Sequence, residues 1–191
     1  MTERSLADLI EGCCQGKEAA MKSFYERFHG YALSVCLAYT NSREDACEIL
    51  NDGFMKAFGK LKELQNPDVL LPWLRRIMVN TAIDHYRKNL KRRHDISVEA
   101  VEHSLAEPHL NDEGILAQLS AEYILEQLQK LPSTYRVVFG LYVLEGYSHR
   151  EIGEQLHLAE STSRAHLAEA NRLLRKALSV QNDKNYERNR K

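Results

Sequence analysis

With 191 residues, 43% of them hydrophobic, the chain can bury one medium core or two small ones, and its apolar stretches are too short to span a bilayer. Asp8, Glu11 and Glu18 interrupt the segment where a signal peptide would have its apolar region, so the sequence predicts a cytoplasmic protein without membrane insertion. A formal net charge of −1 would by itself argue against nucleic-acid binding. This average is misleading, however, because basic and acidic residues are segregated along the chain.

Helix-forming residues dominate throughout the chain. It has nine Gly and only four Pro, many Leu, Ala, Glu, Lys and Arg, and no run in which apolar and polar residues alternate as they do in strands. The sequence therefore predicts an all-α fold.

Apolar residues at helical spacing begin near the N-terminus. Leu6, Leu9, Ile10 and Cys13 predict a first short helix, and the apolar positions between residues 20 and 39 then recur every three or four residues. We expect these segments to be core helices.

The helix predicted over residues 42–61 has a well-marked start. Ser42 is followed three residues later by Asp45, a capping-box-like pair whose acid also favours a helix N-terminus. Gly53 lies inside the apolar stripe of this helix, where a Gly costs only about 1 kcal/mol relative to Ala. Such a Gly predicts the close approach of another backbone or of a neighbouring helix.

A break and a long basic helix follow. Asn66-Pro67 interrupts the helical pattern, so residues 64–71 are predicted to form a short loop. Pro72 and Trp73 then begin a helix that runs to Arg93. Between residues 72 and 94 there are seven Lys or Arg residues against one acid, so this helix is strongly basic.

The charge then changes sign twice. Residues 95–129 carry eight acids and no Lys or Arg, whereas residues 161–191 carry eight basic residues and three acids. Two cationic segments around an anionic one suit a protein that grips a phosphate backbone at two places, because each neutralised phosphate releases counterions. For any one run alone, a solvated helix face is the simpler explanation.

These patterns divide the chain into two helical domains, over residues 1–95 and 112–180. Residues 96–111 lack an apolar period and contain Pro108, so we interpret them as an acidic linker, and residues 181–191 as a polar, disordered tail. In the second domain, a helix stops at Pro132 and another, capped by Ser133, ends at Gly146.

The sequence after Gly146 predicts a helix-turn-helix. Ser148 and Glu151 have the spacing of a capping box, a tight turn follows over residues 157–160, and Ser161 is expected to cap a second helix that reaches Leu178. The second helix of such a motif enters the major groove with its N-terminal residues facing the bases. The candidate base readers are Ser161, Thr162, Arg164, Ala165, His166 and Glu169.

The usual signatures of metal sites and enzymes are missing from the sequence. Its four cysteines have neither the C-x-x-C spacing nor a nearby His that a zinc site needs, so we expect reduced thiols. Glu48 and Asp52 have no His, nucleophile or phosphate loop beside them, and no H-E-x-x-H, Walker A or G-x-S-x-G motif occurs. We expect no catalytic residue, no metal and no cofactor.

Three stretches, in order along the chain, resemble the extracytoplasmic-function (ECF) class of RNA polymerase sigma factors in the sigma-70 family. Residues 45–58 (DACEILNDGFMKAF) resemble the family helix that docks on the coiled coil of the polymerase β′ subunit. Residues 73–88 (WLRRIMVNTAIDHYRK) are similar to the signature W-L-x-x-I-x-x-N-x-x-x-D-x-x-R. Residues 131–178 resemble the C-terminal module of the family.

The resemblance implies a division of labour between the domains. Residues 1–95 would bind core polymerase and would recognise and melt the minus-10 element, whereas residues 112–180 would read the minus-35 element. The linker would follow polymerase channels that normally hold nucleic acid. The implied partners are the RNA polymerase core, through its β′ coiled coil and β flap, promoter DNA and an anti-sigma factor.

The resemblance also implies site residues. Those for core-polymerase binding are Asp45, Glu48, Ile49, Asp52, Phe54 and Lys56. Those for the minus-10 element are Gln65, Asn66, Asp68, Trp73, Arg75, Arg76, Asn80, Asp84, Arg87, Lys88, Lys91 and Arg92. In the family, the loop before the tryptophan forms a pocket for a flipped base, and the matching residues here are 64–71 with Asn80. Trp73 could stack on a base, although a lone Trp at a helix start is more commonly a core anchor. The minus-35 residues are the six base readers named above.

Several positions depart from the family pattern, among them Asn51 and Gly53 in the docking helix and Glu169, which stands where a basic residue is common. His157 stands where the turn usually has Gly, and we expect it to adopt the left-handed conformation that His tolerates better than most residues. Ser163 replaces an apolar core residue of the second helix of the motif.

Two other functions fit the motif alone. A dimeric transcription regulator would bind duplex DNA without polymerase, and a structural adaptor would bind another protein and never DNA. A sigma factor, by contrast, should bind DNA weakly until core polymerase is present.

Overall fold

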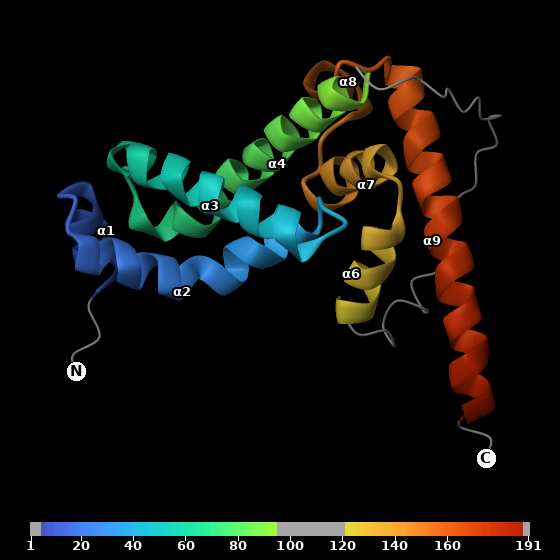
Figure 1. Ribbon diagram of the computed structural model, residues 1–191, viewed down its shortest axis with the longest axis horizontal. Coiled ribbons are helices and arrows are strands. Elements are labelled where there is room, and N and C mark those ends of the chain that lie inside the picture. The colour runs from blue at the N-terminus through green and yellow to red at the C-terminus, as the bar shows by residue number, and fades with distance from the viewer. Residues whose placement is uncertain (1–4, 95–120, 189–191) are drawn as a thin grey trace. The chain divides into compact units, whose positions relative to one another are not determined.

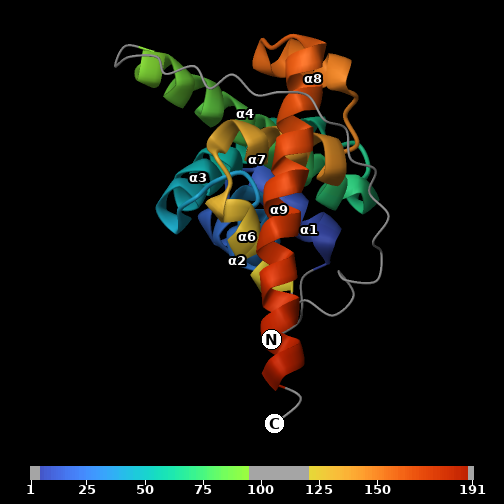
Figure 2. The same ribbon diagram turned by 90° about the vertical axis from the view of Figure 1, so that its right-hand side faces the viewer.

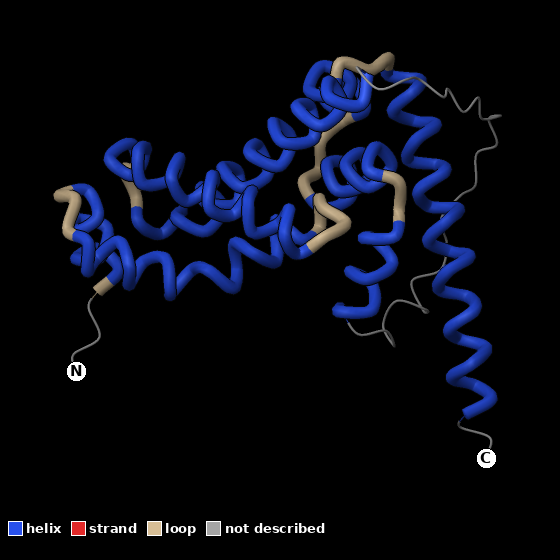
Figure 3. Tube along the Cα trace, viewed as in Figure 1, coloured by secondary structure: helices blue, strands red, loops and turns tan. Residues whose placement is uncertain are grey.

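The computed structural model describes residues 5–94 and 121–188, with side chains over residues 5–90 and 122–178. In the described ranges every regular element is a helix, as predicted (Figure 3). The chain forms two compact units, Met1–Tyr86 and Arg87–Lys191. The predicted linker over residues 96–111 and the predicted start of the second domain at residue 112 lie outside the described residues.

The first unit is built from α1 (Leu6–Cys14), α2 (Glu18–Leu37), α3 (Arg43–Lys60) and most of α4 (Leu70–His94) (Figure 1). Two short 3₁₀ turns, Leu61–Glu63 and Pro67–Val69, connect α3 to α4. Helix α2 packs against both α1 and α3. This unit carries the predicted polymerase-binding and minus-10 residues up to Asp84.

Aromatic rings fill the space between α2 and α3. Phe24 is fully buried; its ring centroid lies 4.7 Å from that of Phe28 and 6.4 Å, edge-on, from that of Phe54. Phe58 completes the cluster at 5.7 Å from Phe24. Tilted and edge-on aromatic pairs add to the free energy gained by burial, so these rings hold the two helices in a fixed register.

Gly53 allows α4 to approach α3, as the sequence predicted. A β-carbon on Gly53 would collide with the sulfur of the buried Met78 on α4. The absence of a side chain on Gly53 therefore lets the two helices pack closely.

Helix α4 begins at Leu70, two residues before the predicted start at Pro72. The side chain of Asn66 accepts a hydrogen bond from the backbone N–H of Asp68 at 2.9 Å and caps the 3₁₀ turn that leads into the helix. Pro72 needs no hydrogen-bond donor in the first helical turn, so it does not delay the start. Part of the predicted loop over residues 64–71 is thus helical.

The second unit contains α6 (Ala121–Lys130), α7 (Ser133–Phe139), a π-helical turn (Gly140–Leu144), α8 (His149–Leu156) and α9 (Glu160–Arg188). Figure 1 and Figure 2 both show α7 alongside α9. The core of this unit contains Leu128 of α6, Leu131 just after it, and Ala170 and Leu174 of α9, and Tyr135 and Phe139 of α7 pack against this cluster. This packing presents α8 and the start of α9 as a helix-turn-helix.

Three predicted helix ends in this unit were wrong. Pro132, not Ser133, precedes α7, and no side chain caps that end. Helix α9 begins at Glu160, so Ser161 lies inside it and does not cap it. Helix α9 also continues to Arg188, through most of the predicted tail, because residues 179–188 contain neither Gly nor Pro to stop it.

A buried arginine that was not predicted from the sequence lies on α7. The guanidinium of Arg136 on α7, which is only 2% exposed, donates hydrogen bonds to the carbonyl oxygens of Leu128 at 3.1 Å and Leu131 at 2.6 Å. The last carbonyls of a helix have no partner within it. Arg136 therefore caps the end of α6 from within α7.

The four cysteines are free thiols, as predicted. Burial raises the pKa of Cys13 to about 11 and that of Cys36 to about 12. At neutral pH these two side chains stay protonated and act as small apolar residues.

Among the described helices, none combines the length and apolar character that crossing a membrane requires.

Candidate nucleic-acid interfaces

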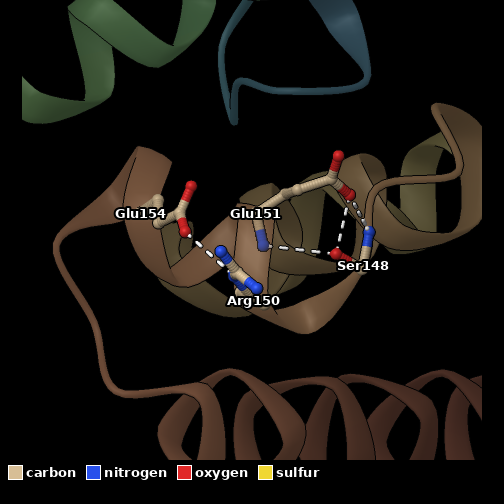
Figure 4. A network of polar contacts seen from close by, with 4 residues as sticks. All are labelled: Ser148, Arg150, Glu151 and Glu154. Carbon is tan, nitrogen blue, oxygen red and sulfur yellow. Dashed lines mark hydrogen bonds and ion pairs between the residues drawn. The ribbon is translucent and has the colours of Figure 1, made fainter.

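The helix-turn-helix begins with the predicted capping box, drawn in Figure 4. The backbone N–H of Ser148 donates to a carboxylate oxygen of Glu151 at 2.8 Å, and the N–H of Glu151 donates to the hydroxyl oxygen of Ser148 at 3.3 Å. Hydrogen bonds from the Ser148 hydroxyl and N–H lower the pKa of Glu151. In the first turn of α8, Arg150 forms an exposed ion pair at 3.2 Å with Glu154, one turn further along the helix.

The turn of the motif relies on two residues with special backbone roles. His157 adopts the left-handed conformation, with φ 56° and ψ 45°, as predicted for the residue at the family's glycine position. The N–H of Leu158 returns to the carbonyl of Gly153 at 3.0 Å. A β-carbon on Gly153 would lie 2.7 Å from the carbonyl oxygen of Leu158, so only glycine fits there without a shift of the turn.

A buried polar contact joins the two helices of the motif. Ser163, which has no exposed surface, lies with its hydroxyl 3.0 Å from Nδ1 of His149 on α8. The ring of His149 also stacks on Tyr142, with the centroids 4.5 Å apart. Burial, and secondarily the charge of Arg164, lowers the pKa of His149. The departure at Ser163 is therefore matched by a partner that the sequence analysis did not identify.

The predicted base readers divide into two groups. Ser161 and Arg164 are exposed and Thr162 and Ala165 half-buried, and Arg164 forms an ion pair with Glu160 one turn earlier. His166 instead lies against the ring of Tyr135, with the centroids 5.2 Å apart. Glu169 accepts hydrogen bonds from Arg172 at 2.8 and 2.6 Å. His166 thus faces α7, and the carboxylate of Glu169 is engaged by the guanidinium of Arg172.

The predicted minus-10 residues on α4 lie mainly along one face. Trp73, Arg76, Asn80, Asp84 and Arg87 follow one another at intervals of three or four residues, the spacing of a single helix face. Arg76 and Asn80 are exposed, and Trp73 is half-buried, so it is not a fully buried core anchor.

Four further predicted residues lie on the same helix. Arg75 is half-buried and Lys88 is exposed. Lys91 and Arg92 lie on the last turns of α4, where the side chains are outside the described residues.

Exposed apolar side chains lie beside the predicted minus-10 residues before Trp73. Gln65, Asn66 and Asp68 are exposed, although the side chain of Asn66 is engaged as the cap described above. Val69 and Leu71 are 47% and 43% exposed. Both lie in the stretch 64–71 that the family resemblance assigned to the pocket for a flipped base, although neither was named as a site residue.

The polymerase-binding prediction on α3 needs a correction. Ile49 and Phe54 are 1% and 2% exposed, because they belong to the stripe that packs on α2, and they cannot touch a partner. Glu48, Asp52 and Lys56 are exposed and Asp45 is half-buried. Met55, which is 70% exposed, lies among them and was not predicted.

An ion pair connects this α3 surface to α4. The ammonium of Lys56 lies 3.0 Å from a carboxylate oxygen of Asp84. A residue predicted to bind polymerase and a residue predicted to bind the minus-10 element are therefore direct neighbours.

Two protein-family models match the chain. The model of sigma-70 region 2 matches residues 24–92, and the model of sigma-70 region 4 matches residues 121–174. The first match covers most of α2, all of α3 and most of α4, and the second extends from the beginning of α6 into α9.

Curated relatives are similar over nearly the whole chain. The RNA polymerase sigma-H factor of Pseudomonas aeruginosa is 22% identical over 185 residues, which cover 93% of this chain and 96% of the relative. The ECF RNA polymerase sigma-E factor of Haemophilus influenzae is 23% identical over 181 residues, covering 91% and 94%. The sigma factor RpoE of Bartonella quintana, solved in complex with the anti-sigma factor NepR, is 19% identical with a TM-score of 0.47, covering 83% of this chain and 98% of that chain.

Proposed function

This chain belongs to the sigma-70 family of RNA polymerase sigma factors, in its ECF class, and from that premise we propose which of its surfaces contact polymerase and promoter DNA. It is an alternative sigma factor, a transcription initiation factor and not an enzyme. Its partners are core polymerase and promoter DNA, so we expect it to act in the cytoplasm.

The face of α4 is proposed to bind and melt the minus-10 element. One observation carries this assignment: the exposed Arg76 and Lys88 lie on a helix that begins beside the exposed apolar residues Val69 and Leu71. Melted DNA needs cations for its phosphates and apolar or aromatic surfaces for its unstacked bases. Trp73, half-buried at the start of the same face, supplies an aromatic ring.

The start of α9 is proposed to read the minus-35 element in the major groove. Ser161, Thr162, Arg164 and Ala165 are the residues that we assign to base or backbone contact, since they are exposed or half-buried on the first turns. Arg164 would exchange its ion pair with Glu160 for DNA, an exchange that costs little because exposed pairs contribute about 0–1 kcal/mol.

The exposed side of α3 is proposed to dock on core polymerase. We assign the contact to Asp45, Glu48, Asp52, Met55 and Lys56, in place of the buried Ile49 and Phe54. A large exposed apolar residue surrounded by charges is typical of the centre of a protein interface.

We also propose that an anti-sigma factor covers this α3 surface. A free alternative sigma factor would compete constantly for polymerase, and a partner on the same residues would prevent that. In an assay in which the anti-sigma factor competes with core polymerase for the chain, Met55→Ala or Asp52→Asn in the chain should weaken its binding to the anti-sigma factor. If the purified chain, without any partner, neither binds core polymerase nor supports transcription, no anti-sigma factor is needed to inhibit it, and the proposal is contradicted.

Separate variants test the two DNA contacts in holoenzyme reconstituted with core polymerase. On promoters selected from genomic fragments, the double variant Arg76→Ala and Lys88→Ala should lower open-complex formation, because fewer cations hold the melted strand. The slope of log affinity against log salt should fall by roughly 1.4–1.8 in magnitude. Arg164→Ala should instead weaken closed-complex binding and reduce the effect of base changes in the minus-35 element.

Lys22→Ala, on α2, serves as the matched control for these charge removals. Its side chain is 75% exposed and lies on neither proposed DNA surface, so transcription should be unchanged. Equal losses in Lys22→Ala and in the α4 double variant would contradict the assignment of α4 to the minus-10 element.

A further inference from the structure

Three potential metal ligands lie close together within the first unit. Asp45 and Glu48 lie three residues apart on α3, and His85 lies on α4. One carboxylate oxygen from each acid and one ring nitrogen of the histidine all lie within 4.8 Å of one another. No metal site was predicted from the sequence, because the acids and the histidine are far apart along the chain.

The separation between the Glu48 and His85 ligand atoms fits a small divalent ion. Nε2 of His85 lies 3.5 Å from Oε2 of Glu48. In a tetrahedral zinc site, with bonds of about 2.1 Å, two donor atoms are about 3.4 Å apart. The side chain of Glu48 is 65% exposed and can adjust its position, whereas that of His85 is only 17% exposed and is held by its surroundings.

The packing of α3 and α4 brings these ligands together without the metal. The Lys56–Asp84 ion pair, at 3.0 Å, joins the helices one residue from His85, and Gly53 against Met78 brings the helices close together. A site formed in advance costs little conformational entropy on binding.

We propose that Asp45, Glu48 and His85 form a site for a divalent transition metal ion such as Zn²⁺, with water completing the coordination. One imidazole and two carboxylates form a mixed nitrogen and oxygen donor set, which suits transition metals, whereas Mg²⁺ and Ca²⁺ favour oxygen ligands alone. Three protein ligands leave at least one position open to water.

Metal binding would also regulate docking, an inference that rests on the proposed function of α3. Asp45 and Glu48 are two of the five residues assigned to polymerase contact. The ion would neutralise their charges and fix the positions of their carboxylates. Metal-loaded protein should therefore bind core polymerase less tightly than metal-free protein.

Binding is tested on the full-length chain by titration with Zn²⁺, and with Co²⁺ as a spectroscopic probe of coordination. The chain has eight histidines, so variants are needed to assign the site. His85→Asn and Glu48→Gln should each weaken binding by more than about 10-fold, the smallest loss commonly seen when even an outer-shell partner is removed.

A matched control replaces an acid and a histidine elsewhere in the first unit. Glu26 and His29, three residues apart on α2, are changed together to Gln and Asn, and this double variant should bind metal as the wild type does. Circular dichroism spectra that match the wild type exclude misfolding as the cause of any loss. If His85→Asn binds with wild-type affinity, or if the α2 control loses binding equally, the site is not the one proposed.

Transcription with reconstituted holoenzyme tests the regulatory part separately. Zn²⁺ should inhibit initiation by the wild-type chain, and His85→Asn should resist inhibition at the same concentration. Equal inhibition of the wild type and His85→Asn would contradict the claim that this site regulates docking, but it would not contradict metal binding at the site. A metal-free chain that does not initiate transcription would count against the proposed function and not against the metal site.

Discussion

Gly153 lies where the chain folds back over α8, and its lack of a β-carbon sets the geometry of the helix-turn-helix. A methyl group there would lie 2.7 Å from the Leu158 carbonyl oxygen, which is backbone and cannot swing away. Gly153→Ala should therefore lower the free energy of unfolding by about 1–3 kcal/mol, the usual cost of overpacking. Urea denaturation followed by circular dichroism measures this loss.

Gly59→Ala on α3 is the matched control for that prediction. Gly59 is exposed and has open space around its α-carbon, so the added methyl should stabilise the helix by about 0.5–1 kcal/mol. Two alanine variants with effects of the same sign would argue against the close contact at Gly153.

His149 makes the stability of the second unit depend on pH. Its pKa lies below the ordinary 6.5, because burial and the charge of Arg164 disfavour the protonated ring. The unfolded chain then binds a proton that the folded chain does not, so the free energy of unfolding falls as pH drops below 6.5. The loss levels off once the folded protein is protonated as well.

The variant His149→Asn tests the origin of this dependence. An Asn amide can replace Nδ1 beside Ser163 but does not titrate. Urea midpoints measured between pH 5 and pH 7.5 should fall less steeply on acidification in the variant than in the wild type. Identical slopes in the two proteins would assign the pH dependence to other groups.

The sequence indicated some residue roles and left others undetermined. His157 was predicted to be left-handed from its place in the turn, which is a local property, and the structure confirms it. The partner of Ser163 was not predicted, because His149 reaches it only once α8 and α9 have packed. Contacts of that kind depend on the tertiary fold and leave no mark in local spacing.

Among the helices, the junction of α6 and α7 depends on Arg136. Its buried guanidinium donates hydrogen bonds to the carbonyls of Leu128, in the last turn of α6, and of Leu131, just after that helix. Arg136→Met keeps much of the side-chain volume but removes both hydrogen bonds, although the Leu128 carbonyl still accepts the N–H of Leu131. We expect a loss of roughly 1.5–3 kcal/mol for hydrogen bonds that involve a charged group.

Arg150→Met is the matched control for Arg136→Met. Arg150 is 81% exposed in its side chain and makes only a surface ion pair on α8, so its loss should change stability by less than about 0.5 kcal/mol. Thermal unfolding compares the two variants directly. Equal midpoints would show that the buried guanidinium does not stabilise the junction.

Helix α3 shows why elements were easier to predict than sites. The apolar stripe of this helix gave its span and its buried face, and Ser42 is hydrogen-bonded to the N–H of Asp45 at 3.0 Å as its spacing suggested. The family resemblance, however, assigned the buried Ile49 and Phe54 to polymerase contact and missed the exposed Met55. A motif identifies a helix, whereas the face that a residue occupies is decided by what packs against it.

For the molecule as a whole, the all-α class followed from composition, and the alternation of basic and acidic blocks suggested two nucleic-acid contacts. The ligand set of Asp45, Glu48 and His85 could not be predicted in the same way, because it forms only when α3 and α4 pack side by side. Sequence spacing carries information about one helix at a time.

Run-off transcription with core RNA polymerase, paired with duplex binding by the isolated chain, tests the central claim most directly. We predict that the chain co-purifies with core polymerase, directs initiation from a subset of promoters and binds duplex DNA only weakly when alone. Tight, sequence-specific duplex binding by the isolated chain, with no association with polymerase, would contradict this account and would indicate an independent helix-turn-helix regulator.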